Sequence, residues 1–297
     1  MKEITYEDYQ RLPEIQGYVV IGEVEISLLK RHKITKFTPP NFTLESTTVW
    51  SFPERGDWAT HYGDYRGNWS PYIPRNLILR YTDKGELVLD QMVGSGTTLV
   101  ECKLLERRGI GVDINPNAVM VTRNRLDFDY KFPGNEEHEI RTYVGDARNL
   151  DLIDDESIDL IATHPPYMDA ISYSGGCIEG DLSNIHDVDK FVKEMGKVAE
   201  ESFRVLKPGK HCAILIGDVR RHKHFVLITP RILQVFLDVG FILREDIIKL
   251  QWNMKSTREK WKGKHDFLLI AHEHLYVFRK PGKGENLSEL KGSVKWW

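Results

Sequence analysis

A glycine-rich turn after a short apolar segment is the first place where the residue types suggest chemistry. The segment 87–89 ends at Asp90, and the turn that follows contains Gly94, Ser95, Gly96, Thr97 and Thr98. Glycines in a strand-to-helix turn let the backbone approach a ligand closely and leave helix N–H groups free to bind polar atoms. The third glycine of a dinucleotide fingerprint and the lysine of a phosphate-binding loop are both missing. The turn therefore predicts a ligand site of another kind, with an ordinary tight turn as the alternative.

Acidic residues end the next two expected strands. Asp113 ends the strand that follows the glycine-rich turn, and Asp146 ends the one after it. Asp113 could accept hydrogen bonds from both hydroxyls of a ribose, and Asp146 could bind an adenine amino group. Ile114 and Ala147 directly follow these carboxylates, so we expect them in the same pocket. A lone aspartate at a strand end often only caps a turn, but three at successive strand ends favour a ligand pocket.

A rigid turn follows the fourth expected strand and has the sequence Thr163, His164, Pro165, Pro166 and Tyr167. Two consecutive prolines cannot continue a central strand, so they turn the chain at the carboxyl end of the strand. Such a turn would present a backbone carbonyl, the ring of His164 and the face of Tyr167 to one cleft. A rigid loop with a packed tyrosine is the alternative interpretation.

Together, the glycine-rich turn and the downstream Pro-Pro-Tyr turn resemble those of the N4-cytosine/N6-adenine DNA methyltransferases. The similarity covers roughly residues 50–280, and segments 50–53, 58–61 and 66–71 resemble a bacterial and archaeal branch of that family. Family members carry Ser, Asp or Asn at the place of His164. The resemblance implies S-adenosyl-L-methionine as cofactor and double-stranded DNA as partner. It also implies a seven-stranded sheet whose last strand is antiparallel, and a base flipped out of the duplex.

The resemblance gives the proline-rich turn a chemical role. The lone pair of an exocyclic amine is delocalised into the aromatic ring, so the amine is a poor nucleophile. Acceptance of its hydrogens by the carbonyl of Pro165 and the ring of His164 would aim the lone pair at the methyl group, while Tyr167 stacks on the base. His164 must be neutral to accept, so with an ordinary pKa of about 6.5 its protonation would suppress activity between pH 8 and 5.5. The alternative is that His164 only orients the loop.

Several features narrow the acceptor without fixing it. Methylation at carbon 5 of cytosine needs a cysteine nucleophile, typically after a proline, and none of Cys102, Cys177 and Cys212 follows a proline. Thr163 before a non-acidic residue slightly favours N4 of cytosine over N6 of adenine. An RNA or protein-amide methyltransferase and a non-catalytic, cofactor-binding specificity module remain as alternatives.

The elements that must position these residues follow from hydrophobic periodicity. Expected strands cover residues 87–89, 109–113, 141–144, 158–162, 211–216, 241–250 and 267–278, and expected helices cover 74–81, 98–107, 116–125, 188–205 and 229–239. Strands that alternate with helices of this length predict an α/β fold with a doubly wound, mostly parallel, Rossmann-like sheet. Ligands of such sheets bind at the carboxyl ends of the strands, where the residues above are found.

The charge of the chain makes DNA binding depend on local basic surfaces. The net charge is −3, so a DNA-binding face cannot come from overall charge. The clusters most suited to phosphate contacts contain Arg220, Arg221, Lys255, Arg258, Lys260, Lys262 and Lys264. A solvated charged loop is the alternative for each. Residues 1–72, 168–190 and 253–265 are the segments that would read the DNA sequence.

Composition sets the remaining expectations. The 297 residues are 41% hydrophobic, without a membrane-length apolar run or an apolar leader at Met1. The pattern predicts a 1–72 extension followed by a catalytic domain over 73–297 that includes the basic loop. The scattered cysteines predict no disulfide framework and no zinc site. We expect a soluble, cytoplasmic, nucleoid-associated protein, with a cognate restriction endonuclease as a candidate partner.

Overall fold

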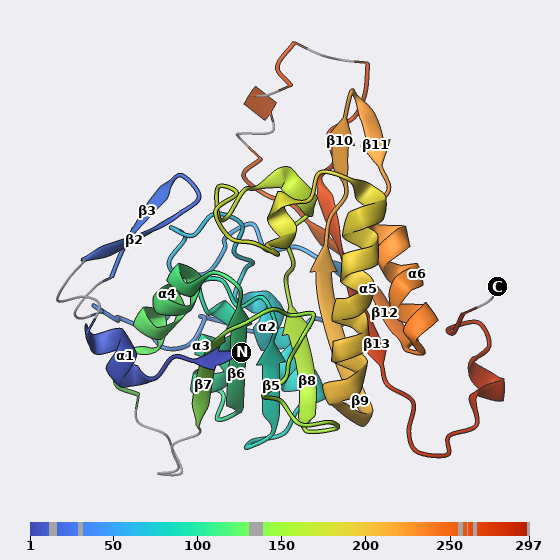
Figure 1. Cartoon of the computed structure of the whole chain (residues 1–297), viewed down its shortest axis with the longest axis horizontal. Coiled ribbons are helices and arrows are strands. Elements are labelled where there is room, and N and C mark those ends of the chain that lie inside the picture. The colour runs from blue at the N-terminus through green and yellow to red at the C-terminus, as the bar shows by residue number, and fades with distance from the viewer. Residues whose placement is uncertain are drawn as a thin grey trace.

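The computed structural model describes residues 1–11, 17–28, 32–130, 139–254, 258–259, 261–263 and 266–295. A nine-stranded sheet forms its centre, in the order β1-β7-β6-β5-β8-β9-β13-β12-β4 (Figure 1). The strands in that order are Lys2–Glu3, Ile140–Val144, Arg108–Asp113, Leu87–Asp90, Ile158–Thr163, Leu206–Ile216, His272–Arg279, Ile242–Leu250 and Val49–Trp50.

The sheet confirms the predicted fold class and adds two short strands. Strands β7, β6, β5, β8 and β9 are parallel, and β13 runs antiparallel to both of its neighbours, β9 and β12. The predicted seven strands become nine because β1 pairs with β7 and β4 pairs with β12 at the two edges. Strand β13 begins at His272 and not at residue 267, since the apolar residues just before it lie outside the ladder.

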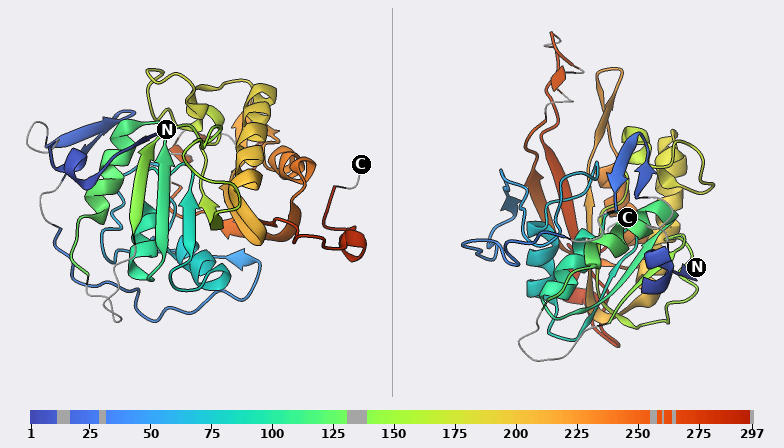
Figure 2. Two further views of the ribbon diagram at one scale, coloured as in Figure 1. Left: turned by 60° about the horizontal axis from the view of Figure 1, so that its bottom comes forward. Right: turned by 90° about the vertical axis from the view of Figure 1, so that its left-hand side faces the viewer.

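Helices cover both faces of the sheet (Figure 2). Helices α2 (Tyr72–Tyr81), α3 (Thr97–Leu104) and α4 (Pro116–Leu126) lie on one face, and α5 (Val188–Val205) and α6 (Thr229–Val239) lie on the other. Side chains alternate along β5 accordingly: Val88 belongs to the core under α2 and α3, and Leu89 to the core under α5 and α6. Helix α3 is shorter than predicted because Glu106 takes a left-handed φ of 61° just beyond it. Among the described residues, no helix is long and apolar enough to cross a membrane.

The predicted 1–72 extension packs against the same core. Helix α1 (Tyr6–Arg11) contacts α4, and the hairpin of β2 (Tyr18–Ile21) and β3 (Val24–Ser27) packs on α4 through Val19, Ile21 and Ile26. Smaller elements follow the sheet strands: the 3-10 turns η1 (Met168–Ala170), η2 (Leu182–Asn184) and η3 (Leu287–Leu290), and the hairpin of β10 (Val219–Arg221) and β11 (His224–Val226).

A buried carboxylate on α3 holds the aromatic loop before α2 in place. Glu101 has no exposed surface and accepts hydrogen bonds from Trp58 Nε1 at 2.7 Å, His61 Nε2 at 2.7 Å and Arg75 Nη1 at 2.8 Å. Burial lowers the pKa of His61. A buried charge is tolerated only when donors surround it, and three donors do so here. The loop therefore depends on one residue of the central fold.

Replacement of this carboxylate should destabilise the protein strongly. Glu101→Ala leaves the Trp58, His61 and Arg75 donors buried without their acceptor, so we expect the free energy of unfolding to fall by about 3–5 kcal/mol in urea titrations. Glu200→Ala, at an exposed position of α5, is the matched control and should change it by less than about 0.5 kcal/mol. Equal effects of the two changes would contradict the role given to Glu101.

Candidate active site

Most of the predicted cofactor residues line one cleft, with a cavity volume of about 90 Å3, at the carboxyl ends of β5, β6 and β7. The residues that line it and were expected there are Asp90, Gly94, Ser95, Thr97, Asp113, Ile114, Asp146 and Ala147. Gly67, Asn68 and Trp69 from the aromatic loop and Tyr173 and Asp181 from the loop after β8 complete the wall. The cleft is therefore built by segments far apart in the sequence.

Two residues of the glycine-rich turn shape the turn and do not line the cleft. Gly96 has a φ of 80°, and a Cβ there would lie 2.9 Å from Thr122 Cγ2, so no other residue fits without strain. Thr98 is fully buried, and its Oγ1 donates to Asp90 Oδ2 at 2.5 Å. The structure thus places both Gly96 and Thr98 behind the cleft, where they fix the conformation of the turn.

Asp90 joins the glycine-rich turn to the proline-rich turn. Its side chain is buried and accepts hydrogen bonds from Met92 N at 3.2 Å, from Thr98 Oγ1, and from Thr163 Oγ1 at 3.0 Å. Burial raises the pKa of Asp90 to about 6, although these three donors favour the charged form. One carboxylate therefore fixes the ends of β5 and β8 relative to each other.

Asp113 is held in an orientation that leaves part of its carboxylate toward the cleft. Its Oδ1 accepts from Asn115 N and its Oδ2 accepts from Gly94 N, each at 2.9 Å. Burial raises the pKa of Asp113 to about 6, and the nearby carboxylate of Asp181 acts in the same direction. Each carboxylate oxygen can accept a second hydrogen bond, so Asp113 can still bind a pair of hydroxyls.

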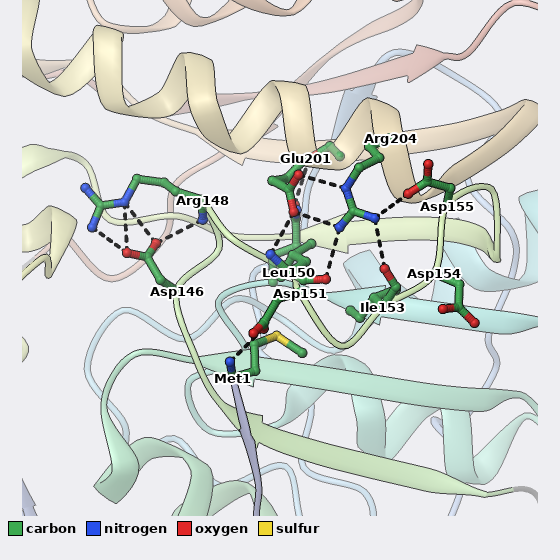
Figure 3. A network of polar contacts seen from close by, with 12 residues as sticks. Met1, Asp146, Arg148, Leu150, Asp151, Ile153, Asp154, Asp155, Glu201 and Arg204 are labelled. Atoms are coloured by element: carbon green, nitrogen blue, oxygen red, sulfur yellow. Dashed lines mark hydrogen bonds and ion pairs between the residues drawn. The ribbon is translucent and has the colours of Figure 1, made fainter.

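Asp146 is paired inside the protein, which the sequence did not indicate. Both of its oxygens accept from the guanidinium of Arg148 (Figure 3). The same guanidinium also contacts Glu194 and the carbonyl of Gly180. Its side chain keeps 35% of its surface exposed at the cleft. Arg148 therefore holds the carboxylate of Asp146 in place at this edge of the cleft.

The proline-rich turn separates the first cleft from a second and wider one. The second cleft has a cavity volume of about 710 Å3, and its lining includes Pro165, Tyr167, Lys249, Trp252 and Glu273. Both clefts are lined by Gly67, Asn68, Trp69, His164, Pro166 and Tyr173. His164 and Pro166 thus lie where the two clefts meet.

His164 is fixed by an aromatic neighbour and kept neutral. Its ring stacks on Trp69 with centroids 5.6 Å apart and planes inclined by 17°, and its Nε2 lies 2.7 Å from Tyr167 Oη. Burial lowers the pKa of His164 to about 4, against the opposing effect of Glu273. The expectation of an ordinary pKa near 6.5 is therefore wrong, because His164 stays neutral throughout the range from pH 8 to 5.5.

Tyr167 is held by residues that the sequence analysis missed. Its hydroxyl donates to Glu273 Oε1 at 2.7 Å, and Lys249 Nζ donates to Glu273 Oε2 at 2.8 Å. The ring lies against Gly217, where a Cβ would come within 2.6 Å of it. Glu273 shares the inward face of β13 with apolar residues such as Leu275. A charged residue among the apolar positions of this strand was the feature of the sequence that could have indicated its role.

Most of the chain matches a model of a known protein family. A model of the DNA methylase family N6_N4_Mtase matches residues 18–124 and 158–295. The chain belongs to this DNA methylase family. Its cofactor is S-adenosyl-L-methionine.

Curated relatives of this methylase match over parts of their length. The type II methyltransferase M.BglII of Bacillus subtilis is 24% identical over 173 residues, which cover 53% of this chain and 46% of the relative. M.HpaI of Haemophilus parainfluenzae is 44% identical over 54 residues, 18% of this chain and 17% of the relative. A tRNA (guanine(10)-N2)-dimethyltransferase of Methanothermobacter thermautotrophicus is 35% identical over 112 residues, 37% of this chain and 31% of the relative. The chain thus spans less than half the length of these relatives.

Solved structures with a similar fold include methyltransferases of low sequence identity. The crystal structure of TrmN from Thermus thermophilus has a TM-score of 0.49 and 18% identity, and the match covers 72% of this chain and 50% of that one. A SAM-dependent methyltransferase of Methanosarcina mazei has a TM-score of 0.47 and 16% identity, over 69% of this chain and 97% of that one.

The basic residues predicted to touch DNA are placed differently from one another in the methylase. Arg220 donates to the carbonyls of Lys223 and Leu268, and Arg221 pairs with Asp169. Both residues line the second cleft. The hairpin that carries them projects at the top of Figure 1, beyond the carboxyl end of β9. Arg258 and Lys262 are exposed, and the remaining predicted contacts, Lys255, Lys260 and Lys264, lie outside the described residues.

The buried Asp90 should give the methylase a distinctive dependence of stability on pH. Its folded pKa of about 6 exceeds the unfolded value of about 3.9, so the native state takes up the proton first as the pH falls. Stability from this group is therefore complete below about pH 4 and is lost as the pH rises through 6. Relative to Asp90→Asn, the wild type should gain up to about 3 kcal/mol between pH 6 and 4 in urea unfolding. Curves of unfolding free energy against pH that run parallel for the wild type and Asp90→Asn would contradict this. The exposed control Asp154→Asn should give a curve parallel to that of the wild type.

Proposed function

We propose that this methylase transfers a methyl group from S-adenosyl-L-methionine to the exocyclic amino group of a base in double-stranded DNA. The observation that carries the proposal is the junction of the two clefts at His164 and Pro166. A cofactor in the first cleft and a base in the second would meet there. A base inside a duplex cannot reach a recessed junction, so the base must be flipped out.

The first cleft has the chemistry that the cofactor needs. The cofactor supplies an electrophilic methyl group on a sulfonium centre. Asp113 would accept hydrogen bonds from the ribose hydroxyls, and Asp146 would accept from the adenine amino group. Gly94, Ser95 and Thr97 would hold the cofactor beside the start of α3, whereas Gly96 and Thr98 keep the turn in shape from behind. Ile114 and Ala147 would pack against the adenine ring.

The junction of the clefts would prepare the amine for attack. The carbonyl of Pro165 and the ring of His164 would accept the two amine hydrogens, which favours a pyramidal nitrogen with its lone pair toward the methyl group. Tyr167 would stack on the base, with its ring held by Gly217 and Glu273. Preorganised acceptors and alignment lower the barrier without a covalent intermediate. Thr163 before a non-acidic residue favours N4 of cytosine slightly over N6 of adenine.

DNA would lie across the mouth of the second cleft. Arg258 and Lys262 are exposed. Together with Lys255, Lys260 and Lys264, they would contact phosphates. Arg220 and Arg221 would support the hairpin that flanks the duplex. The proposed catalytic domain is residues 73–297, and residues 1–72 would add DNA contacts from the other side. Such a protein would act on chromosomal DNA in the cytoplasm, with a cognate endonuclease as candidate partner.

The product decides the proposal. The protein is incubated with isotope-labelled S-adenosyl-L-methionine and duplex DNA, and the DNA is digested to nucleosides for mass spectrometry. We expect label in N4-methyl-2′-deoxycytidine or N6-methyl-2′-deoxyadenosine, and none when the protein is omitted. Label that enters total RNA or a protein extract but not DNA would overturn the proposal in favour of the acceptor that is labelled.

Asp113 should control cofactor affinity and its pH dependence. Asp113→Asn removes a charged acceptor, so we expect S-adenosyl-L-methionine to bind about 10–100-fold more weakly by calorimetry at pH 7.5. Only the ionised carboxylate accepts from both hydroxyls, and its pKa is about 6. Wild-type affinity should therefore fall as the pH drops from 7 to 5, whereas affinity of the variant should change little. A variant that binds as tightly as the wild type would remove Asp113 from the site.

A further inference from the structure

We infer that Glu273 on β13, held by Lys249 on β12, fixes His164 in the tautomer that carries its proton on Nε2 and leaves Nδ1 as the acceptor for the target amine. Glu273 and Lys249 are then positioning residues for the methyl-transfer site. The inference rests on the proposed function only for the last step, the contact of Nδ1 with an amine. The tautomer itself follows from contacts within the protein.

The hydroxyl of Tyr167 has a single hydrogen to donate. That hydrogen is donated to Glu273 Oε1, with the two oxygens 2.7 Å apart. The same hydroxyl lies 2.7 Å from His164 Nε2. Since a hydroxyl has one hydrogen and that hydrogen is used, Tyr167 Oη must accept on the side of His164. The proton between them therefore belongs to Nε2.

Lys249 determines the direction of the hydrogen bonds from His164 through Tyr167 to Glu273. Its ammonium group donates to Glu273 Oε2 at 2.8 Å, and its charge lowers the pKa of Glu273 although the carboxyl is buried. A carboxylate has no hydrogen to donate, so Tyr167 can only donate to it. The reverse chain, with Glu273 protonated and donating to Tyr167, would bury the ammonium of Lys249 beside a neutral acid.

These hydrogen bonds leave one nitrogen of His164 available. Among the described residues, none forms a hydrogen bond with Nδ1, and His164 lines both clefts. The stack on Trp69 fixes the plane of the ring, and a flip of the ring would put Cε1 in place of Nε2 and break the bond to Tyr167, so Nδ1 keeps its position. A neutral ring with a free lone pair at the junction is the acceptor that an amine requires.

The substitution Glu273→Gln should reverse the direction of these hydrogen bonds. Lys249 can only donate, so the new amide must turn its oxygen toward Lys249 and its NH2 group toward Tyr167. Tyr167 Oη would then accept from the amide and donate its hydrogen to His164 Nε2. The proton of the imidazole moves to Nδ1, and the acceptor at the junction becomes a donor that repels the amine hydrogens.

The tautomer can be measured without any reaction. Full-length protein labelled with 15N-histidine is studied by long-range 1H–15N correlation NMR without DNA or cofactor, and the His164 signals are assigned from their loss in His164→Asn. We expect the protonated nitrogen to be Nε2 in the wild type and Nδ1 in Glu273→Gln. A wild-type ring protonated on Nδ1, or a tautomer unchanged by Glu273→Gln, would overturn the inference.

Kinetics give a second readout that a merely structural role would not produce. With cognate DNA and saturating cofactor, Glu273→Gln should lower kcat about 100-fold with little change in the KM for S-adenosyl-L-methionine. Addition of Lys249→Met frees the amide to turn its oxygen toward Tyr167, so the double variant should regain Nε2–H and at least tenfold in kcat. A double variant with a lower kcat than Glu273→Gln alone would contradict this relay, the hydrogen bonds that join Lys249, Glu273, Tyr167 and His164.

A matched control separates this effect from a general loss of a carboxylate. Glu245→Gln makes the same chemical change on β12, at a side chain that forms an ion pair with Arg244 and does not contact Tyr167. It should leave both the tautomer and kcat unchanged. The proposed function fails if wild-type protein does not methylate DNA, whereas the relay fails on the NMR result, so the two failures are distinguishable.

Discussion

The geometry of the site depends on one buried carboxylate. Asp90 lies at the end of β5 and receives the hydroxyl of Thr98 from one turn and the hydroxyl of Thr163 from the other. Parallel strands bring the two turns near each other, but the ladder alone leaves the turns free to shift relative to one another. The two hydroxyl contacts set that relation, so the wall between the clefts is fixed at the strand ends.

The same construction recurs elsewhere in the molecule. Asp90, Glu101 and Glu273 are each buried, and each is surrounded by donors from distant segments of the chain. Burial of a charge is costly, and the cost is offset only when all donors are in place together. Each of these carboxylates therefore ties a loop to a helix or strand of the central fold in one arrangement. The aromatic loop 50–72 becomes part of the site in this way, because Glu101 holds Trp58 while Trp69 reaches His164.

Periodicity predicted the sheet well because each strand is short, apolar and followed by a turn of distinctive composition. The glycine-rich and proline-rich turns were predicted for the same reason. The start of β13 was misplaced, since apolar residues before His272 line a cleft and do not continue the strand. The pKa of His164 could not be predicted, because Trp69, far away in the sequence, buries it. The pairing of Asp146 with Arg148, two residues on, was missed because it depends on how the chain turns after β7. The DNA-contacting residues and the domain boundary stay predictions.

The wall shared by the two clefts has a thermodynamic consequence. Trp69, His164 and Pro166 each present surface to both sides, so an occupant of one cleft alters the free energy of the other through the same atoms. Such coupling is reciprocal: whatever factor a bound cofactor applies to the affinity for a base, a bound base applies to the affinity for the cofactor. In the proposed reaction, transfer of the methyl group would change both occupants in one event. Release of the two products would then be linked through the residues that line both clefts.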